Sequence, residues 1–476
     1  MSTPWRPDVL AALAGVVGAD RVLTAPEDLH VYGYDGTAML FKAPRAVIDL
    51  TASAQVAPIV KLANELDFKI IARGAGSGLS GGSVPVDDAV VLVLTRLNRI
   101  LEIDEANLTA LVEPGVITQT LHTEVESRGL FYPPDPGSGK VSTLGGNVAE
   151  NSGGLRGLKY GVTKDYVMGL EVVLPNGETI WSGNKCVKDV AGYDLKHVFI
   201  GSEGTLGIFT RILLKLIPKP PAKRTMVAYF ASMRAAAEAV SAIIARKVIP
   251  ATLEFLDQVT MRCVEDYAKL GLQTQHGALL LIEVDGHPGQ VVDEAAAVTD
   301  ACREHGACQF ATAADEAEAL KMAAARRVAF TALARVRPTT ILEDATVPRS
   351  ALPEMIDIIE ACARRHNLQI GTFGHAGDGN LHPTFLTDER DHDEIARVEL
   401  AFNDIFDGAL ALGGTITGEH GTGTAKMPFL ARQYNDPTLA MMRTLKHLLD
   451  PRELLNPGKV LLPGRRLGEG LEVPAA

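Results

Sequence analysis

The stretch Lys69-Ile70-Ile71-Ala72-Arg73-Gly74-Ala75-Gly76-Ser77-Gly78-Leu79-Ser80-Gly81-Gly82 decides the fold of this 476-residue chain. Its opening run predicts a buried strand, and the glycines that follow predict a tight loop. Gly76 to Gly81 formally match the GxGxxG pattern of a dinucleotide-binding βαβ unit. That unit requires a helix directly after the glycines, with its N-terminus facing the pyrophosphate. Ser83 to Asp88 leave no room for such a helix before the next apolar run, so a Rossmann unit is excluded.

The glycine-rich part of this stretch has two interpretations. Its backbone N–H groups could form a concave nest that binds pyrophosphate without a helix, or it could be a flexible surface loop. Its position directly after a strand favours the nest. Two further loops, Ser142 to Gly154 and Gly201 to Gly207, are also dense in glycine and carry polar groups that could line an aromatic ring system. Each loop alone is a weak signal.

Short apolar runs around these loops predict the first half of the fold. Strands are expected at 46–50, 69–73, 89–94, 101–104, 108–113 and 208–217, and helices at 53–66 and 118–128. Leu170 to Trp181 is typical of a hairpin in which Asn176-Gly177 forms a type I′ turn. Pro218 to Pro221 cannot continue a helix or a central strand, so we place a domain boundary there.

Beyond this boundary, alanine-rich helical patterns alternate with strand-like runs. Strands are expected at 226–230, 252–256, 278–284 and 341–347, and helices from about residues 232, 259, 288, 350 and 438. A further helix is expected from Asp315 to Arg335. The alternation predicts an α+β sheet with helices packed on one face. We therefore expect three units, at residues 1–221 (core from about 40), 222–430 and, as a C-terminal helical segment, 431–476.

Bulk composition narrows the classes of function. Apolar residues make up 46% and charged residues 22%, which is typical of a soluble globular protein. The net charge of −12 argues against a nucleic-acid partner, because phosphate binding needs a basic surface. It also means that an anionic substrate needs a local cation. The five cysteines have no CxxC spacing and predict reduced thiols in a cytoplasmic protein.

Neither a signal peptide nor a membrane helix is expected. Met1 to Asp8 has no apolar segment behind it, and no apolar run approaches the roughly 20 residues that a membrane helix needs. We expect a cytoplasmic protein without a transmembrane segment, which a partner could still hold peripherally at a membrane.

A second informative stretch is Gly374-His375-Ala376-Gly377-Asp378-Gly379-Asn380-Leu381-His382. If Asp378-Gly379 is a two-residue hairpin turn, His375 lies directly opposite His382. Opposed residues share one face, with Cβ atoms roughly 5 Å apart, so two imidazoles could hold one divalent cation at about 2.1 Å each. Gly418-Glu419-His420-Gly421 supplies a carboxylate beside another imidazole. The alternative is a polar loop whose histidines are merely solvated.

Together these motifs resemble a known family. Arg73 to Gly82, Lys159 to Thr163 and Gly201 to Gly207 look like the FAD domain of the vanillyl-alcohol oxidase superfamily. The segments Gly374 to His382, Gly418 to Gly421 and Asn456-Pro457-Gly458-Lys459 resemble its D-2-hydroxyacid dehydrogenases, which include the flavin-binding subunit of glycolate oxidase and cytochrome-type D-lactate dehydrogenase. The resemblance covers roughly residues 40 to 460. It implies a vanillyl-alcohol-oxidase-type FAD-binding domain followed by an α+β substrate domain.

The resemblance also implies which residues bind FAD. The pyrophosphate would contact the loop residues Gly74, Ala75, Gly76, Ser77, Gly78 and Leu79. The flavin and the rest of FAD would contact Ser142, Thr143, Gly146, Asn147, Asn151, Gly161, Glu203, Gly204 and Ile208, with Asn456 reaching the isoalloxazine ring. Some members hold FAD covalently through a histidine of the pyrophosphate loop. No histidine or cysteine lies between Arg73 and Gly82, so non-covalent FAD is expected.

The chemistry of such an enzyme fits the second stretch. Oxidation of a 2-hydroxy acid requires removal of the hydroxyl proton and transfer of the Cα hydride. A divalent metal on the hydroxyl oxygen eases the first step, and a neutral histidine can take the proton. We assign His375, His382 and Glu419 as metal ligands and His420 as the general base, and the resemblance supports these four roles. Two imidazoles and a carboxylate favour Zn²⁺, although Mn²⁺ or Fe²⁺ would fit.

The substrate carboxylate needs a fork-shaped cation, for which arginine is the geometric match. Arg326 aligns with the substrate arginine of the family; the alternative is an arginine on a solvated helix face. The family's 2-hydroxyglutarate enzymes place a threonine and a lysine, for a second carboxylate, where this chain has Phe330 and Leu342, and an asparagine where it has Thr384. A second carboxylate would therefore be buried without partners. Glycolate or D-lactate is the expected substrate, with D-2-hydroxyglutarate as the alternative.

Other functions and partners stay open from the sequence. One alternative is a metal-dependent hydrolase with merely structural glycine loops, and another is a non-catalytic flavoprotein subunit. No iron–sulfur cysteine pattern exists, so electrons must leave to another protein, a quinone or O₂. In the glycolate oxidase case the resemblance implies a partner flavoprotein and an iron–sulfur subunit. The oligomeric state is open.

Overall fold

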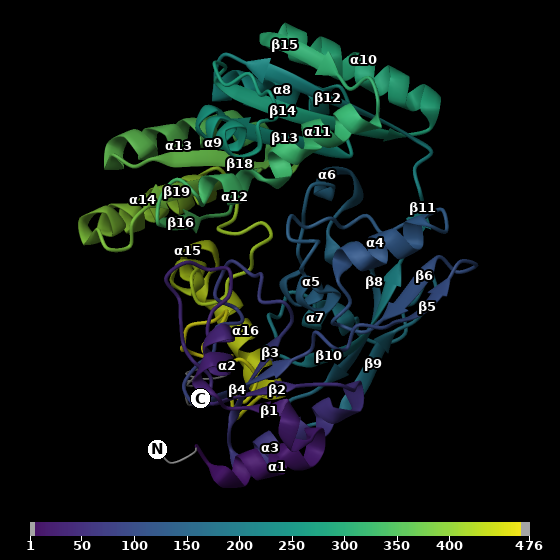
Figure 1. Cartoon of the computed structure of the whole chain (residues 1–476), viewed down its shortest axis with the longest axis vertical. Helices are drawn as coiled ribbons and strands as arrows, with labels where there is room; N and C mark the ends of the chain where they lie inside the picture. Colours follow the sequence, from purple (N-terminus) through teal and green to yellow (C-terminus); the bar gives the residue numbers. More distant parts are fainter. Residues whose placement is uncertain (1–4, 468–476) are drawn as a thin grey trace, which may run out of the picture.

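The computed structural model describes residues 5–467 and shows two lobes stacked along the longest axis of the molecule (Figure 1). Within these residues, the lower lobe contains a four-stranded and a five-stranded sheet, and the upper lobe contains an eight-stranded sheet. The last helices return from the upper lobe to the lower one (Figure 1). The α+β class expected from the sequence is confirmed.

The four-stranded sheet and its helices come first in the chain. The elements are α1 (Pro7–Val17), β1 (Val22–Leu23), α2 (Pro26–Val31), β2 (Ala46–Asp49), α3 (Val56–Leu66), β3 (Lys69–Arg73) and β4 (Ala89–Val93). The strand order is β1-β2-β4-β3, with β2, β4 and β3 parallel. α1 and α3 pack their apolar sides on this sheet in one core. Residues 74–88 form no helix, which confirms the exclusion of a Rossmann unit.

The five-stranded sheet is antiparallel and has the order β5-β6-β10-β8-β9. The elements of this part are β5 (Ile100–Asp104), β6 (Thr109–Val112), α4 (Thr118–Glu126), β7 (Leu130–Phe131), α5 (Leu144–Glu150), α6 (Gly157–Tyr160), β8 (Val167–Val173), β9 (Thr179–Gly183), α7 (Lys196–Phe199), β10 (Ile208–Lys215) and β11 (Ile217–Pro218). The apolar sides of α4 and α5 share one core with the sheet. This packing holds the start of α5 at the inner edge of the lobe.

The β8–β9 hairpin is confirmed, but its turn is not the expected type I′ turn. Gly177 has a φ of +81°, whereas Asn176 has no positive φ, and a type I′ turn requires both. The N–H of Gly177 donates to the carbonyl oxygen of Leu174 at 2.8 Å. Pro175 fixes φ near −65° at the second position of this turn, so the glycine takes the left-handed position alone.

The upper lobe is built on one antiparallel sheet. Its strands are β12 (Ala222–Phe230), β13 (Thr252–Asp257), β14 (Ala278–Gly286), β15 (Ala307–Thr312), β16 (Thr339–Leu342), β17 (Ala345–Thr346), β18 (Ile370–His375) and β19 (Asn380–Thr387). Their order is β15-β12-β14-β13-β18-β19-β16, and β17 pairs with β19. The hairpin β18–β19 therefore lies inside the sheet and is held on both sides.

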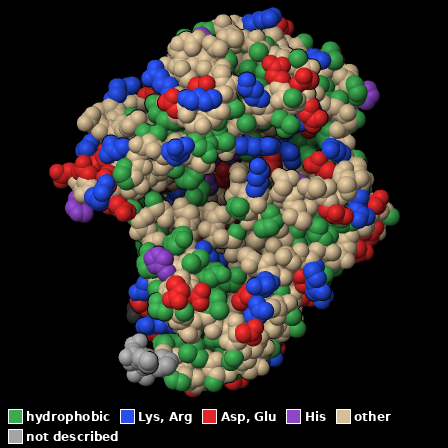
Figure 2. All heavy atoms as spheres, viewed as in Figure 1, with side chains coloured by type: hydrophobic (Ala, Val, Ile, Leu, Met, Phe, Trp, Pro, Cys, Tyr) green, Lys and Arg blue, Asp and Glu red, His purple; other side chains and the backbone are tan. Residues whose placement is uncertain are grey.

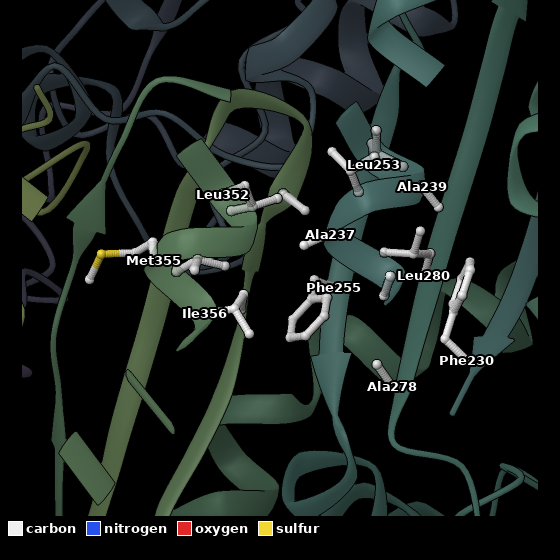
Figure 3. Packing of buried hydrophobic residues seen from close by; sticks show 14 of the residues in the cluster. Phe230, Ala237, Ala239, Leu253, Phe255, Ala278, Leu280, Leu352, Met355 and Ile356 are labelled. Carbon is white, nitrogen blue, oxygen red and sulfur yellow. The ribbon is translucent and has the colours of Figure 1, made fainter. Parts of the chain in front are cut away.

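Helices cover both faces of this sheet, so the expectation of helices on one face was wrong. The first face carries α8 (Met233–Ala245), α10 (Pro288–Glu304), α13 (Leu352–His366) and α14 (His392–Ala411), the second α9 (Gln258–Ala268), α11 (Glu316–Arg327) and α12 (Ala329–Leu333). Phe230, Phe255 and Leu280 point to the first face (Figure 3). Tyr229 and Leu279 point to the second. Apolar side chains on both sides of a strand need a cover on both sides.

The expected helix from Asp315 to Arg335 is interrupted. α11 ends at Arg327, Val328 caps it, and α12 begins at Ala329. The break places the end of α11 over the hairpin β18–β19, where the guanidinium of Arg326 lies over the ring of Phe373 at 4.7 Å.

The C-terminal stretch ties the two lobes together. Its helices are α15 (Leu430–Gln433) and α16 (Asp436–Leu449). Beyond them Leu455 forms a bridge with Ile70 of β3, and the N–H of Asn456 donates to the carbonyl oxygen of Ile70 at 2.8 Å. The division of the chain into units 1–221, 222–430 and 431–476 stays a prediction. Between residues 5 and 467, no helix is both long and apolar enough to cross a membrane.

Candidate active site

A cavity of about 570 Å³ joins the segments that the sequence singled out. One wall comes from the lower lobe and contains residues 74–79, which follow β3. The upper wall contains Arg326 of α11, and His375 and His382 of the β18–β19 hairpin. Glu419 and His420 complete it. The surface is hollowed between the lobes, and basic side chains lie along the hollow (Figure 2).

The loop at residues 74–79 offers backbone N–H groups to this cavity. No N–H of this loop donates a hydrogen bond to any residue of the described part of the chain. A Cβ at Gly74 would clash with Oγ1 of Thr143, and a Cβ at Gly76 would clash with the guanidinium of Arg73. A glycine loop with unpaired N–H groups fits a pyrophosphate. The residues present therefore fit the anionic part of FAD.

The other residues expected to contact FAD divide into two groups. Those that line the cavity are Ser142, Thr143, Gly146, Asn147, Glu203, Gly204 and Ile208. Asn151, Gly161 and Asn456 are not among the lining residues. The side chain of Asn151 caps a turn, because its Oδ1 accepts the N–H of Lys164 at 2.9 Å.

Asn456 is buried against the cavity wall. Its Nδ2 donates to the carbonyl oxygens of Gly82 and Glu203 at 2.8 and 2.7 Å. Its Oδ1 is buried and has no partner among the described residues. An unpaired buried acceptor is costly, so Asn456 has one oxygen available for a donor.

The hairpin that carries the histidines has a different register from the expected one. His375 pairs with Asn380, and His382 pairs with Phe373. Residues 376–379 form a longer connection than the expected two-residue turn. The direct pairing of His375 with His382 was wrong. They are diagonal neighbours on one face, however, with ring centroids 5.3 Å apart.

Three side chains present ligand atoms toward one point. The Nε2 atoms of His375 and His382 lie 3.0 and 3.2 Å from Oε1 of Glu419. Nδ1 of His375 lies 2.8 Å from Oε1 of Glu254, which leaves Nε2 directed at the cluster. Burial alone lowers the pKa of His375, but Glu254 and Glu419 raise it well above its usual value. Two imidazoles and a carboxylate fit a divalent cation such as Zn²⁺.

His420 lies beside this cluster. Its Nε2 is 3.8 Å from Oε1 of Glu419, and its ring stacks on that of His382 with centroids 4.9 Å apart. Burial lowers the pKa of His420 to about 4; Asp344 opposes this, while His382 and Lys426 add to it. A neutral imidazole at physiological pH can accept a proton.

Arg326 is buried and lines the cavity, which excludes the alternative of a solvated helix face. Its Nε donates to Oε2 of Glu254 at 2.5 Å. Phe330 and Leu342 line the same cavity. Thr384 is fully buried outside it and donates to the carbonyl oxygen of His382 at 3.1 Å.

The sequence analysis missed two buried carboxylates that hold these groups. Glu254 contacts both His375 and Arg326. Its signal in the sequence was a single charge within the apolar run Thr252 to Leu256. Asp344 accepts the consecutive backbone N–H groups of residues 418, 419 and 420 at 2.8, 3.0 and 3.0 Å. No sequence pattern marked Asp344.

Two other clusters have ligand-like spacing but are explained without a cation. The first is Asp344, His382 and His420, and the second is Cys362, His366 and Asp404. Oδ2 of Asp344 is occupied by backbone donors. Oδ2 of Asp404 is 2.8 Å from both Arg365 and His366. The cluster at Glu419 is the one that faces the cavity.

Comparison with known proteins defines the class to which the chain belongs. Residues 44–183 match the sequence profile described as "FAD binding domain", and residues 219–460 match "FAD linked oxidases, C-terminal domain". The chain belongs to the FAD-linked oxidases and is a flavoprotein oxidoreductase. This class excludes the metal-dependent hydrolase considered above.

Individual relatives are similar over almost the whole chain. The glycolate oxidase subunit GlcD of Bacillus subtilis (strain 168) is 52% identical, covering 94% of this chain and 95% of the relative. A D-lactate dehydrogenase of Anaerostipes hadrus is 34% identical, covering 91% and 93%. Among solved structures, p-cresol methylhydroxylase aligns with a TM-score of 0.79 at 19% identity, covering 95% of this chain and 96% of that one. The expected vanillyl-alcohol-oxidase-type fold is confirmed.

Proposed function

We propose that this chain oxidises a short D-2-hydroxy acid, glycolate or D-lactate, to the 2-oxo acid, with FAD and a divalent metal ion bound at the cavity. The main support is one cavity that contains the glycine loop, the ligand cluster at Glu419 and Arg326. The names of the relatives, a glycolate oxidase subunit and a D-lactate dehydrogenase, agree with this substrate class. Bound FAD supplies the hydride acceptor.

Arg326 binds the substrate carboxylate. Its Nε is bonded to Glu254 and its guanidinium lies over Phe373. These two contacts fix the plane of the guanidinium and leave its Nη groups for the cavity. Planar, paired N–H donors match a carboxylate in a way that a lysine ammonium does not. In a chain with a net charge of −12, this local cation offsets the repulsion of an anionic substrate.

His420 accepts the hydroxyl proton. The lowered pKa keeps its imidazole neutral, and its ring packs directly on a proposed ligand, His382. His375, His382 and Glu419 would hold the metal ion, which would supply Lewis acidity to the hydroxyl oxygen. Zn²⁺ suits this donor set best, and Mn²⁺ or Fe²⁺ are alternatives.

The lining of the cavity favours a short or apolar substrate tail. Phe330 and Leu342 both contribute to the lining. A second carboxylate placed against them would lose its hydration without gaining a partner. Glycolate and D-lactate avoid this cost, which is why D-2-hydroxyglutarate is the less favoured alternative.

Electrons then pass to a non-nicotinamide acceptor. The free cysteines form no iron–sulfur ligand set within residues 5–467. We infer transfer to a quinone or an acceptor protein, with a partner flavoprotein and an iron–sulfur subunit as the expected complex. Such partners could place a cytoplasmic chain at a membrane surface.

A panel of acids tests this proposal. Purified protein is assayed with a dye acceptor on glycolate, D-lactate, L-lactate and D-2-hydroxyglutarate, with and without chelator, and its metal content is measured. His375→Ala should lose metal and turnover but keep FAD, which acid precipitation should release because it is not covalently bound. His420→Ala should keep FAD and metal and lose turnover about 10²- to 10⁴-fold. Surviving turnover in His375→Ala, or a preference for D-2-hydroxyglutarate, would contradict the proposal.

A further inference from the structure

Strand β13 carries two buried acids in an otherwise apolar environment. Glu254 is 0% exposed and Asp257 is 5% exposed. Asp257 has a structural role: its oxygens accept the N–H groups of Thr260 and Thr372 at 2.7 and 2.8 Å. These bonds cap α9 and join β13 to β18. The position of Asp257 is thus explained by secondary structure.

Glu254 differs from Asp257 because its partners are side chains of the cavity. One oxygen is 2.8 Å from Nδ1 of His375, and the other is 2.5 Å from Nε of Arg326. No backbone N–H donates to Glu254 among the described residues. The two partners come from different elements, β18 and α11. A single carboxylate therefore joins two groups that the proposed function places at opposite tasks.

We propose that Glu254 is a positioning residue that couples the metal site to the substrate-carboxylate site. Its Oε1 fixes the imidazole of His375 with Nε2 toward the cluster at Glu419, and its Oε2 fixes the guanidinium of Arg326 with its Nη groups toward the cavity. This inference rests on the proposed function, because it assumes that His375 holds a metal and that Arg326 holds a carboxylate.

The physical basis is the same on both sides. A carboxylate on the second nitrogen of a ligating histidine fixes its tautomer and orientation, and its loss typically weakens metal binding 10- to 100-fold. A bond to the Nε of an arginine immobilises the guanidinium before the substrate arrives, so less entropy is lost on binding. Because one carboxylate makes both bonds, a shift of His375 is transmitted to Arg326.

Glu254→Gln tests this in the full-length, FAD-loaded protein. The amide keeps the size of the side chain, but only its one oxygen can accept from His375 or from Arg326. Metal affinity, measured by competition with a chelator, should fall about 10- to 100-fold. The KM for the better substrate should rise about 10-fold or more, with a smaller change in kcat. FAD content should stay unchanged, since Glu254 does not contribute to the glycine loop.

Asp257→Asn is the matched control, because it makes the same change in the same strand. It should lower thermal stability without altering metal affinity or KM. Arg326→Ala supplies a double-mutant cycle: the effect of Glu254→Gln on KM should disappear in that background, while its effect on metal affinity should persist.

The outcomes separate the inference from the function on which it rests. Unchanged metal affinity and KM in Glu254→Gln overturn the inference, and so do equal effects in Asp257→Asn or additive effects on KM in the double variant. A wild-type protein that holds no metal, together with an unchanged KM in Arg326→Ala, overturns the proposed function itself.

Discussion

Glu150 and Glu203 bring two carboxyl groups together beside the cavity. One oxygen of each lies 3.1 Å from the position that a Cβ at Gly82 would occupy. Glu203 accepts the N–H groups of Thr422 and Gly423 at 2.7 and 2.8 Å, whereas Oε2 of Glu150 has no partner among the described residues. Burial raises the pKa of Glu203 to about 7, and burial together with the charge of Glu203 raises that of Glu150. The folded pair therefore retains a proton.

This proton predicts a pH dependence of stability. The folded pKa values are raised, so the folded state binds more protons than the unfolded state between about pH 4.5 and 7. The free energy of unfolding must then fall as pH rises through this window. Glu150→Gln removes one of the two charges, so its stability should fall less and should exceed the wild-type value at pH 8 by on the order of 1–3 kcal/mol. Urea denaturation of flavin-free protein at pH 5 and pH 8 measures this.

The control for this prediction is Glu65→Gln, which alters an exposed glutamate of α3. Its pH dependence should match that of the wild-type protein. If Glu150→Gln also gives the wild-type slope, the two carboxyl groups do not share a proton.

Arg326→Lys tests the carboxylate-binding role at a single side chain. Lysine keeps the charge but loses the paired donors and the bond from Nε to Glu254. We expect KM to rise about 10- to 100-fold, which corresponds to a loss of about 1.4–2.7 kcal/mol of binding. Arg335→Lys, an exposed arginine beside Tyr267, should leave KM unchanged. Steady-state kinetics that show equal KM values for both variants would assign the carboxylate to another residue.

At the residue scale, the sequence identified groups that have a local motif. His375, His382, Glu419 and His420 stand beside glycines in short, unusual runs, and the structure places them at one cavity. Glu254 has no such motif, because its role depends on partners 72 and 121 residues away. Partners so distant in the chain are set by the tertiary fold, which one sequence does not display.

At the scale of elements, the β18–β19 hairpin shows why an incorrect register still gave a correct cluster. The expected pairing placed His375 opposite His382, and the observed pairing places His375 opposite Asn380. The two registers differ by two residues. Side chains alternate with a period of two along a strand, so a shift of two keeps every side chain on its face, whereas a shift of one would have separated the histidines.

The connection between these strands depends on Gly379. It has a φ of +82°, and a Cβ there would clash with the carbonyl oxygen of Val347. Gly306 has the same φ of +82° but no atom within 4 Å of its Cβ position. Gly306→Ala should cost only the left-handed conformation, about 1–2 kcal/mol. Gly379→Ala should lose at least about 2 kcal/mol more, because backbone must move, and it should also weaken metal binding.

Urea denaturation and metal content of the two glycine variants check this prediction. Gly306 lies after α10 and far from the cavity lining, so its variant should keep full metal content. Equal losses of stability in both variants would mean that the hairpin can shift away from Val347 at no cost.

The packing of the upper sheet was also legible at this scale, but the alternation of elements gave the wrong answer. Met226 to Phe230 is an uninterrupted buried run. Such a run is typical of a strand covered on both faces, and it outweighs a count of helices. The turn at Asn176-Gly177 failed for a comparable reason, because Pro175 restricts the backbone just before it.

At the scale of the whole molecule, the cavity depends on contacts between the lobes. Asp285 of β14 accepts from Nζ of Lys159 at 2.6 Å and from the hydroxyl of Tyr160 at 2.8 Å. Leu158, next to these residues, packs against the core of the upper lobe. Segments more than a hundred residues apart thus form one wall, so the cavity could not be derived from local patterns.

Asp285→Asn should loosen the lobes without unfolding either one. Lys159 would lose its charged partner, and the side chains of this pair are only 21% and 8% exposed, so the loss should reach about 1–3 kcal/mol. FAD contacts both walls in our proposal, so its affinity should fall as well. Trp5 and Trp181 are the two tryptophans of the chain and both belong to the lower lobe. Tryptophan fluorescence therefore follows the lower lobe alone, whereas circular dichroism follows both.

In flavin-free wild-type protein the two signals should change together during urea denaturation. In Asp285→Asn they should separate, because the lobes no longer stabilise each other. Glu283→Gln is the control, since Glu283 lies on the same strand but bonds to Thr225 within the same sheet. It should shift the midpoint without separating the signals. Coincident transitions and unchanged FAD affinity in Asp285→Asn would show that the bridge to Lys159 does not hold the lobes, and that the C-terminal stretch around Leu455 and Asn456 holds them instead.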